Sequence, residues 1–352
     1  AVPVLKALYM SKRNAVRIDD VARLAGVSIA TVSRALSNPT RVRKETLATV
    51  LAAVSKLGYV ADGHARALAS RKSLTIGAVI PSLENAIFAN TIFALQKVLG
   101  ERGYMLVVAC TEYDLDVEVH RVRSLIERGV DGMILTQTLH RPEIFTLLER
   151  FALPHVFTWA YDRDGNLPAV GFDHRRATAQ VTQHMIELGH RDIGVIATRT
   201  KDNKNAQERL AGVLDTLSLA NIKVLQHRII EAPFSFKKGR EALRQLVEKG
   251  APPTAVICLN DVLAIGAMAE AHDLGLSVPQ DISISGCEDL EVAASVTPAL
   301  TTVRYPTWEM GSVAADYILA LLQGASPPEQ CTFPSELVVR RSTAAPRGAT
   351  RT

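Results

Sequence analysis

Residues 18–38 read IDDVARLAGVSIATVSRALSN, and this stretch decides the fold of the N-terminal part of the chain. Apolar residues recur at helical spacing over 18–25, which predicts a helix with one buried face. Gly26 is expected to end this helix and to permit a tight turn. Ser28 is a suitable N-cap for a second helix over 29–36. Two short helices joined by such a turn are typical of a helix-turn-helix, whose second helix enters the major groove of DNA.

The second helix is expected to present small polar side chains to the groove. The candidate groove-facing residues are Ser28, Ile29, Ala30, Thr31, Ser33 and Arg34. The three hydroxyls would lie near phosphate oxygens, where they fix the register without reading the sequence. Ile29 and Ala30 can contact only thymine methyls and groove shape, so discrimination between bases would depend on Arg34.

The charge distribution supports DNA binding over the alternative, an ordinary three-helix bundle. A third helix is predicted over 44–57, and Arg41 and Arg43 in the loop before it are further candidates for DNA contacts. Residues 1–72 contain 13 Lys and Arg against four acidic residues, a net charge of +9. The other 280 residues contain 27 basic and 32 acidic residues, a net charge of −5. A basic head on an acidic body indicates a polyanionic partner for the head alone.

From residue 74 onward the pattern changes to short apolar strands that alternate with amphipathic helices. The predicted strands are 75–80, 105–110, 132–136, 155–159, 192–197, 227–230, 254–259 and 282–286. Such alternation is typical of βαβ units with a parallel sheet. Eight strands are many for one small open sheet, so we expect an α/β core of two doubly wound parallel sheets, one in each lobe.

The predicted boundaries follow from these patterns. They are a helix-turn-helix head over 1–60, a hinge over 61–73, a core over 74–340 and a loose tail over 341–352. The first lobe would comprise about 74–172 and 301–325, and the second about 173–300 and 326–340.

The composition fits a soluble globular protein with a large core. The chain has 352 residues, 47% of them hydrophobic and 22% charged. It contains no apolar run of about 18 residues, so no membrane span is expected. The N-terminus does not resemble a signal peptide, which favours the cytoplasm. The four cysteines form no C-x-x-C pair, and we expect Cys110, Cys258, Cys287 and Cys331 to be buried thiols, although metal or disulfide roles stay open.

Ordered motifs along the whole chain resemble the lactose-repressor (LacI/GalR) family of bacterial transcription regulators. They include IDDVARLAGVSIATVSRALSN and LGYV in the head, then IPSLENAIFA, VDGMIL, ELGHRDIGVI, PTAVICLNDVLAIGAM, GLSVPQDISISG and TPALTTV. The resemblance implies a helix-turn-helix head, a hinge helix and a two-lobed core similar to periplasmic sugar-binding proteins. It also implies a homodimer, sometimes a tetramer, on a pseudo-palindromic double-stranded operator. IPSLENAIFANTI with AVGFD is similar to the gluconate-operon repressors of this family.

The resemblance assigns a DNA-contacting role to the hinge. The residues that match the family pattern there are Tyr59, Ala65, Arg66 and Leu68. The family uses the leucine as a wedge between base steps of the minor groove, which kinks the duplex. Ala61 and Asp62 depart from the usual Pro and Asn, and Gly63 weakens the helix, so this hinge is expected to fold only marginally.

The resemblance also implies an effector site at the carboxyl ends of the core strands. The candidate residues are Phe88, Trp159, Asp173, Asn203, Asn205, Arg209, Phe234, Asn260 and Glu288. An Arg, two acids and amides beside aromatic faces suit a polyhydroxylated small molecule. Lys201, Asn203, Lys204 and Asn205 would add positive charge and amide donors at the mouth, which favours a sugar acid or a sugar phosphate. The alternative for Asp173 and Asn260 is that they only cap the helices that follow them.

Catalysis is not indicated. GxxxxGK[ST], GxSxG and HExxH are absent, and the histidines lack metal-ligand spacing, so no enzyme activity, metal or cofactor is expected. A periplasmic solute-binding protein would share the two-lobed core, but it would have a leader and no basic helical head. We therefore expect a repressor whose operator affinity is changed by an effector bound between the lobes, with release from DNA as the default response.

Overall fold

The computed structural model describes residues 16–61, 72–248 and 250–347. The chain divides into two packing units, one before and one after the boundary between Ser73 and Leu74.

The first unit is a bundle of three α-helices. These are α2 (Ile18–Ala25), α3 (Ile29–Ser37) and α4 (Lys44–Leu57), with the short helix η1 (Pro39–Arg41) before α4. Gly26 ends α2 with φ 68°, a left-handed conformation that favours glycine. Six fully buried or nearly buried side chains form the core: Val21, Ala22, Val32, Ala35, Val50 and Ala53. The predicted helix-turn-helix is therefore confirmed, with the first and third helices at the predicted residues.

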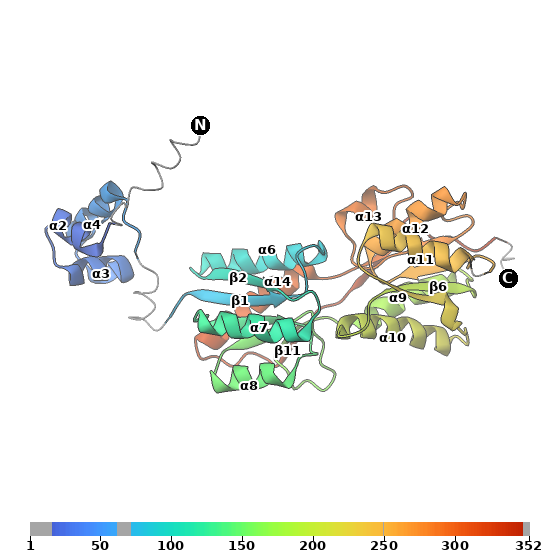
Figure 1. Ribbon diagram of the computed structural model, residues 1–352, viewed down its shortest axis with the longest axis horizontal. Coiled ribbons are helices and arrows are strands. Elements are labelled where there is room, and N and C mark those ends of the chain that lie inside the picture. The colour runs from blue at the N-terminus through green and yellow to red at the C-terminus, as the bar shows by residue number, and fades with distance from the viewer. Residues whose placement is uncertain (1–15, 62–71, 249, 348–352) are drawn as a thin grey trace, which may run out of the picture. The chain divides into compact units, whose positions relative to one another are not determined.

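The first lobe of the second unit contains a six-stranded parallel sheet of order β11-β5-β4-β3-β1-β2. Its strands are β1 (Thr75–Ile80), β2 (Met105–Cys110), β3 (Gly132–Thr136), β4 (His155–Thr158), β5 (Ala169–Gly171) and β11 (Gln330–Thr332). Helices α6 (Ile87–Glu101) and α14 (Thr307–Leu322) cover one face, and α7 (Leu115–Glu127) and α8 (Pro142–Arg150) cover the other (Figure 1). Side chains alternate between these faces, so Ile134 packs with the first pair of helices and Met133 with the second.

The second lobe repeats this arrangement around a four-stranded parallel sheet of order β7-β6-β8-β9. Its strands are β6 (Ile193–Thr198), β7 (Ile229–Ala232), β8 (Ala255–Cys258) and β9 (Ser283–Ser285). Helices α9 (His174–Glu187) and α10 (Lys204–Leu219) cover one face, and α11 (Phe236–Glu248) and α12 (Asp261–Asp273) cover the other (Figure 1). The prediction of two doubly wound parallel sheets is confirmed.

Two expectations about the C-terminal part need correction. Residues 326–340 are expected in the second lobe, but β11 extends the sheet of the first lobe. β12 (Glu336–Val338) pairs antiparallel with β10 (Thr302–Arg304) and lies beside α9 of the second lobe. The tail after residue 340 was expected to be loose, but its described part packs on β9. Ser342 is fully buried, and its carbonyl accepts the Ile284 N–H at 2.9 Å. Both differences arise from backbone hydrogen bonds to distant strands, which cannot be predicted from the sequence pattern of a short polar segment.

The four cysteines are free thiols. Cys258 and Cys287 are buried, as expected, whereas Cys110 and Cys331 are half-buried. The reason is that β2 and β11, which carry Cys110 and Cys331, are the edge strands of the six-stranded sheet.

Within the described ranges, no helix is both long and apolar enough to cross a membrane. The same residues contain no cluster of three or more His, Cys, Asp or Glu suited to a metal ion.

Candidate functional site

The exposed face of α3 is built by residues that do not belong to the core of the head. Val32 and Ala35 anchor the helix inward, and the opposite positions are exposed: Ser28, Ile29, Ala30, Ser33 and Arg34. Ile29 is 49% exposed, so its apolar side chain is accessible to a partner. Arg34 has no ion-pair partner in the part of the chain that the structure describes. Its guanidinium is therefore free to contact a ligand.

Two of the predicted phosphate-contacting hydroxyls also have a structural role. The Ser28 Oγ accepts the Thr31 N–H at 3.2 Å and lies 2.9 Å from the Thr31 hydroxyl. This N-cap begins α3 and holds both hydroxyls at its first turn. Arg41 and Arg43 are exposed before α4, and Tyr59 is half-buried against the core of the head.

The hinge predictions cannot be placed. Ala65, Arg66 and Leu68 lie outside the described residues, as do Asp62 and Gly63.

The second unit contains a cleft of ≈ 840 Å³ between its two lobes. Its walls are the loops that follow β1, β2, β6, β7 and β9, so the cleft lies at the carboxyl ends of both sheets, as predicted. A deeper, narrower part continues below it, and both parts share Asn85, Tyr113, Asn203, Arg209 and Glu288. The cleft is large enough for a monosaccharide or a disaccharide.

A buried cation and a buried acid lie at the floor of this cleft. The Arg209 Nη1 is 4.0 Å from the Glu288 Oε1, and the two residues are 8% and 4% exposed. Burial raises the pKa of the Glu288 carboxyl well above its ordinary value, although the Arg209 charge opposes this shift. The Arg209 Nε and the Glu288 Oε2 have no hydrogen-bond partner among the described residues. Buried polar atoms in folded proteins are nearly always satisfied, so these atoms point to a ligand.

Glu288 is also held in a strained backbone conformation. Its φ of 124° lies in a region that side chains other than glycine rarely adopt. Such strain is found mainly at functional sites, where the surrounding structure fixes it.

Aromatic rings form the deep wall of the cleft. The Phe88 ring lies edge-to-face on Trp159 at 5.1 Å between centroids, and both residues line the deep part of the cleft. Phe172 and Tyr305 pack behind Trp159, at 6.0 and 6.3 Å between ring centroids. The Trp159 Nε1 is buried and has no partner in the described ranges. The wall therefore combines an apolar face with a hydrogen-bonding group, as a sugar-binding site does.

His174 adds a buried acceptor that the sequence did not identify. Its Nε2 donates to the Trp159 carbonyl at 3.2 Å, because a carbonyl can only accept. Burial, helped by the nearby Arg209 charge, lowers the pKa of His174 to about 3. The ring is therefore neutral at pH 7, and its Nδ1 is an unprotonated acceptor at the edge of the pocket with no partner in the described chain.

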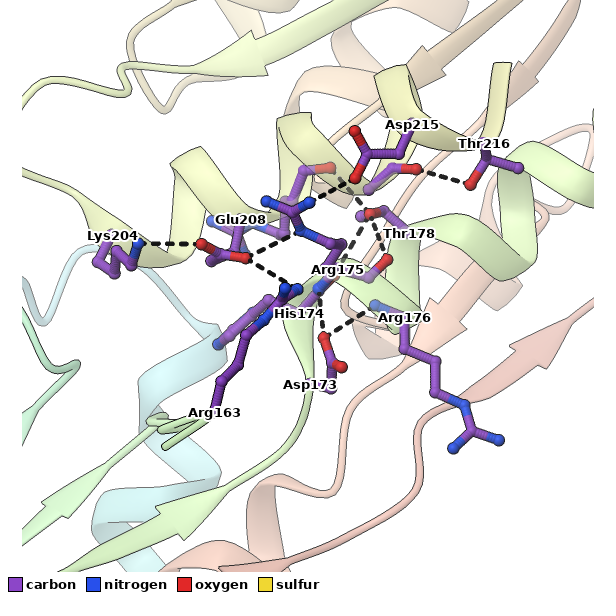
Figure 2. Close-up of polar contacts among 12 residues, drawn as sticks. Arg163, Asp173, His174, Arg175, Arg176, Thr178, Lys204, Glu208, Asp215 and Thr216 are labelled. Carbon is purple, nitrogen blue, oxygen red and sulfur yellow. Dashed lines mark hydrogen bonds and ion pairs between the residues drawn. The ribbon is translucent and has the colours of Figure 1, made fainter. Parts of the chain in front are cut away.

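The other predicted effector residues divide into two groups. Asn203, Asn205 and Phe234 line the pocket, as do Phe88, Trp159, Arg209 and Glu288. Asp173 and Asn260 cap helices and do not line either part of the cleft. The Asp173 Oδ1 accepts the N–H groups of Arg175 and Arg176 at 2.9 and 3.0 Å (Figure 2). The Asn260 Oδ1 accepts the Leu263 N–H at 2.7 Å. Capping therefore accounts for the Asp173 Oδ1 and the Asn260 Oδ1, whereas the buried Asn260 Nδ2 has no partner among the described residues.

Of the two lysines that were expected at the mouth of the cleft, Lys201 lines it and Lys204 does not. The Lys204 ammonium pairs with Glu208 at 3.0 Å, so it is not available at the mouth (Figure 2). The charged residues at the mouth are Glu84, Glu112, Asp114, Asp116, Asp202, Arg141, Arg199 and Lys201. Acidic residues outnumber basic ones there, which disfavours a highly charged anion.

Several lining residues were not predicted from the sequence. Among them are Asn85, Tyr113 and Gln137, in the loops after β1, β2 and β3. Tyr113 and Gln137 have φ of 63° and 68°, uncommon for such residues. The one sequence feature that could have identified these three residues is their position in the loops after predicted strands.

Comparisons with known proteins agree with this architecture. The family profile described as "Bacterial regulatory proteins, lacI family" matches residues 17–62, and that of the "Periplasmic binding protein-like domain" matches residues 182–343. The chain is 33% identical to the HTH-type transcriptional regulator RegA of Clostridium saccharobutylicum, over 94% of this chain and 99% of RegA.

Two solved structures show the same similarity. The lac repressor dimer bound to operator and the anti-inducer ONPF has 29% identity and a TM-score of 0.84, over 94% of this chain and 99% of that one. A complex of the transcriptional regulator CelR with cellobiose has 27% identity and a TM-score of 0.68, over 93% and 99% of the two chains.

Proposed function

We propose, from the premise that this chain belongs to the lacI family of bacterial regulatory proteins, that it represses transcription under the control of a sugar-like effector. It is a DNA-binding transcriptional regulator and not an enzyme, as the members of this family are. The proposal concerns what controls it and which residues act.

The observation that carries the proposal is the set of unpartnered polar atoms at the floor of the cleft. Trp159 Nε1 and Arg209 Nε are donors, His174 Nδ1 is an acceptor, and Glu288 Oε2 can be either, depending on its protonation. A polyol has hydroxyls that both donate and accept, and its carbon skeleton can lie against the Phe88 ring. A cavity that holds only water would also need polar groups, but it would not need an aromatic wall. The combination of unpartnered polar atoms with the Phe88 ring therefore favours a sugar-like ligand over water alone.

A sugar acid is the subclass that the charges favour. The Arg209 guanidinium at the floor is positively charged, whereas burial disfavours the negative charge of the neighbouring Glu288 carboxyl. The floor therefore favours a ligand that carries one negative charge. A guanidinium suits a carboxylate well because it can donate two parallel hydrogen bonds. A sugar phosphate would place about two negative charges near the acidic mouth, which disfavours it.

DNA recognition would use the exposed face of α3. Arg34 would contact base edges, while Ser28, Thr31, Ser33, Arg41 and Arg43 would contact the phosphate backbone. A homodimer would place two heads in successive major grooves about 34 Å apart on a pseudo-palindromic operator. The chain would act in the cytoplasm, where the DNA is. Ligand binding would change the arrangement of the lobes and release the operator, a two-state coupling between distant sites.

Two linked measurements test the proposal. A thermal-shift screen of sugars, sugar acids and sugar phosphates should identify a ligand that raises the unfolding temperature, since a ligand bound only to the native state stabilises it. Fluorescence anisotropy on an operator selected from random DNA should then show weaker binding when that ligand is added. A chain that selects no DNA sequence would refute the regulatory role, and an operator affinity unaffected by every stabilising ligand would refute the effector role.

A further inference from the structure

Gln137 connects the two lobes through a buried hydrogen bond. It follows β3 of the first lobe and is 5% exposed. Its Oε1 accepts the N–H of Lys204 in the second lobe at 2.9 Å, and its Nε2 lies 3.4 Å from the Asp202 carbonyl. Gln137 also lines the deep part of the pocket. One side chain therefore contacts both the other lobe and the space that an effector would occupy.

The acceptor from Gln137 completes the N-terminal cap of α10. The first N–H groups of a helix have no partner within the helix. Asn203 satisfies the Ala206 N–H at 3.0 Å, and Gln137 satisfies that of Lys204, the first residue of the helix. The same helix carries Arg209 on the pocket floor. The position of α10 against the first lobe is thus tied to the position of a ligand-facing guanidinium.

The backbone of Gln137 is fixed on the first-lobe side. Its N–H donates to the Thr158 carbonyl at 2.8 Å, and its carbonyl accepts the His140 Nε2 at 3.1 Å. The His140 ring is buried and bonds Glu118 at 2.9 Å through Nδ1. These contacts hold Gln137 at its left-handed φ of 68°, so its side chain cannot easily follow α10 if the lobes move apart.

A second contact across the lobes is much more exposed. Arg163, in the loop between β4 and β5, lies 3.6 Å from Glu208 of α10, and its side chain is 55% exposed (Figure 2). Exposed ion pairs contribute little free energy because water screens them. Arg163 therefore offers a matched comparison, because it also joins the first lobe to α10 but through an exposed contact.

We infer that Gln137 is a positioning residue that holds α10 against the first lobe and thereby sets the balance between two lobe arrangements. This inference rests on the proposed function, because the lobe arrangement is read out as operator affinity. Loss of the bond would destabilise the arrangement in which Gln137 contacts α10 relative to any arrangement in which the two are apart, so the ligand-free operator affinity is expected to change. A residue that merely touched the effector would leave the ligand-free protein unaltered.

The test compares Gln137→Met with Arg163→Met in the full-length protein without ligand. Gln137→Met is expected to change the affinity for the selected operator by about two- to tenfold, the range for one net hydrogen bond. Arg163→Met should stay within about twofold, since its ion pair is exposed.

Amide hydrogen exchange at the first turn of α10 separates the possible outcomes. Faster exchange at Lys204 in Gln137→Met, together with the shift in operator affinity, supports the inference. Faster exchange with operator affinity within twofold of the wild type would overturn it, since the bond would then be only a local cap. A wild-type protein that does not bind DNA would refute the proposed function instead.

Discussion

His174→Gln should flatten the pH dependence of stability of this protein. The glutamine amide can replace the Nε2 donor to the Trp159 carbonyl, while the titrating ring is removed. In the native protein the pKa of His174 is lowered to about 3 from an ordinary 6.5, mainly by burial. At pH 5 the unfolded chain therefore binds a proton at this position and the native chain does not. By linkage, acid then favours the unfolded state.

The magnitude follows from these two pKa values. Above pH 6.5 the ring is neutral in both states and contributes no pH dependence. The ordinary pKa of 6.5 lies about 1.5 pH units above pH 5, and each unit corresponds to about 1.4 kcal/mol. Lowering the pH from 8 to 5 therefore lets protonation of His174 in the unfolded chain lower the free energy of unfolding by about 2 kcal/mol. The loss continues as the pH falls further, until the native ring is protonated near pH 3.

Urea unfolding of the wild type and the variant at pH 8 and pH 5, at one protein concentration, measures this difference. The wild type should lose about 2 kcal/mol more than His174→Gln, because every other titrating group cancels in the comparison. His272→Gln is the control, since that side chain is 90% exposed, and it should follow the wild type. Parallel losses in the wild type and His174→Gln would refute the claim that the native ring stays neutral.

Three further substitutions test the head, the pocket and the core. Arg34→Ala should weaken operator binding by about 1–3 kcal/mol with little effect on scrambled DNA, measured by anisotropy; equal weakening on both would indicate a phosphate contact. Arg209→Met should lower effector affinity at least about tenfold while operator binding persists, measured by calorimetry, because a charged donor is removed. Gly266→Ala should destabilise the second lobe by about 1–3 kcal/mol, since its Cβ would lie 2.2 Å from the Phe236 carbonyl, whereas Gly100→Ala meets nothing within 4 Å and should not destabilise.

Sequence periodicity predicted the longer elements well. The helices over 18–25 and 44–57 end where left-handed glycines follow them, at Gly26 and Gly58, so their bounds could be predicted to the residue. The strands that were missed, β5, β10, β11 and β12, have three residues each. Three residues span less than two periods of side-chain alternation, and their pairing depends on partners distant in the chain.

The pocket was only partly predictable for a related reason. An Asp or Asn directly after a strand is equally suited to cap the next helix or to bind a ligand, and Asp173 and Asn260 cap. Lys204 and Glu208 are four residues apart on one helix, a spacing that favours an ion pair over a free cation. The role of His174 depends on its burial, and the role of Gln137 depends on its contact with Lys204 of the other lobe. No local sequence pattern predicts either one.

The division of the site between the lobes limits which ligands can regulate this protein. Trp159 and Gln137 belong to the first lobe, whereas His174, Arg209 and Glu288 belong to the second. A ligand shifts an equilibrium between arrangements only by the difference in its affinity for them. A small carboxylate that contacts Arg209 alone would bind every arrangement equally, so it should compete with the effector without altering operator affinity. A ligand that satisfies groups from both lobes must favour one arrangement, and only such a ligand should act as an effector.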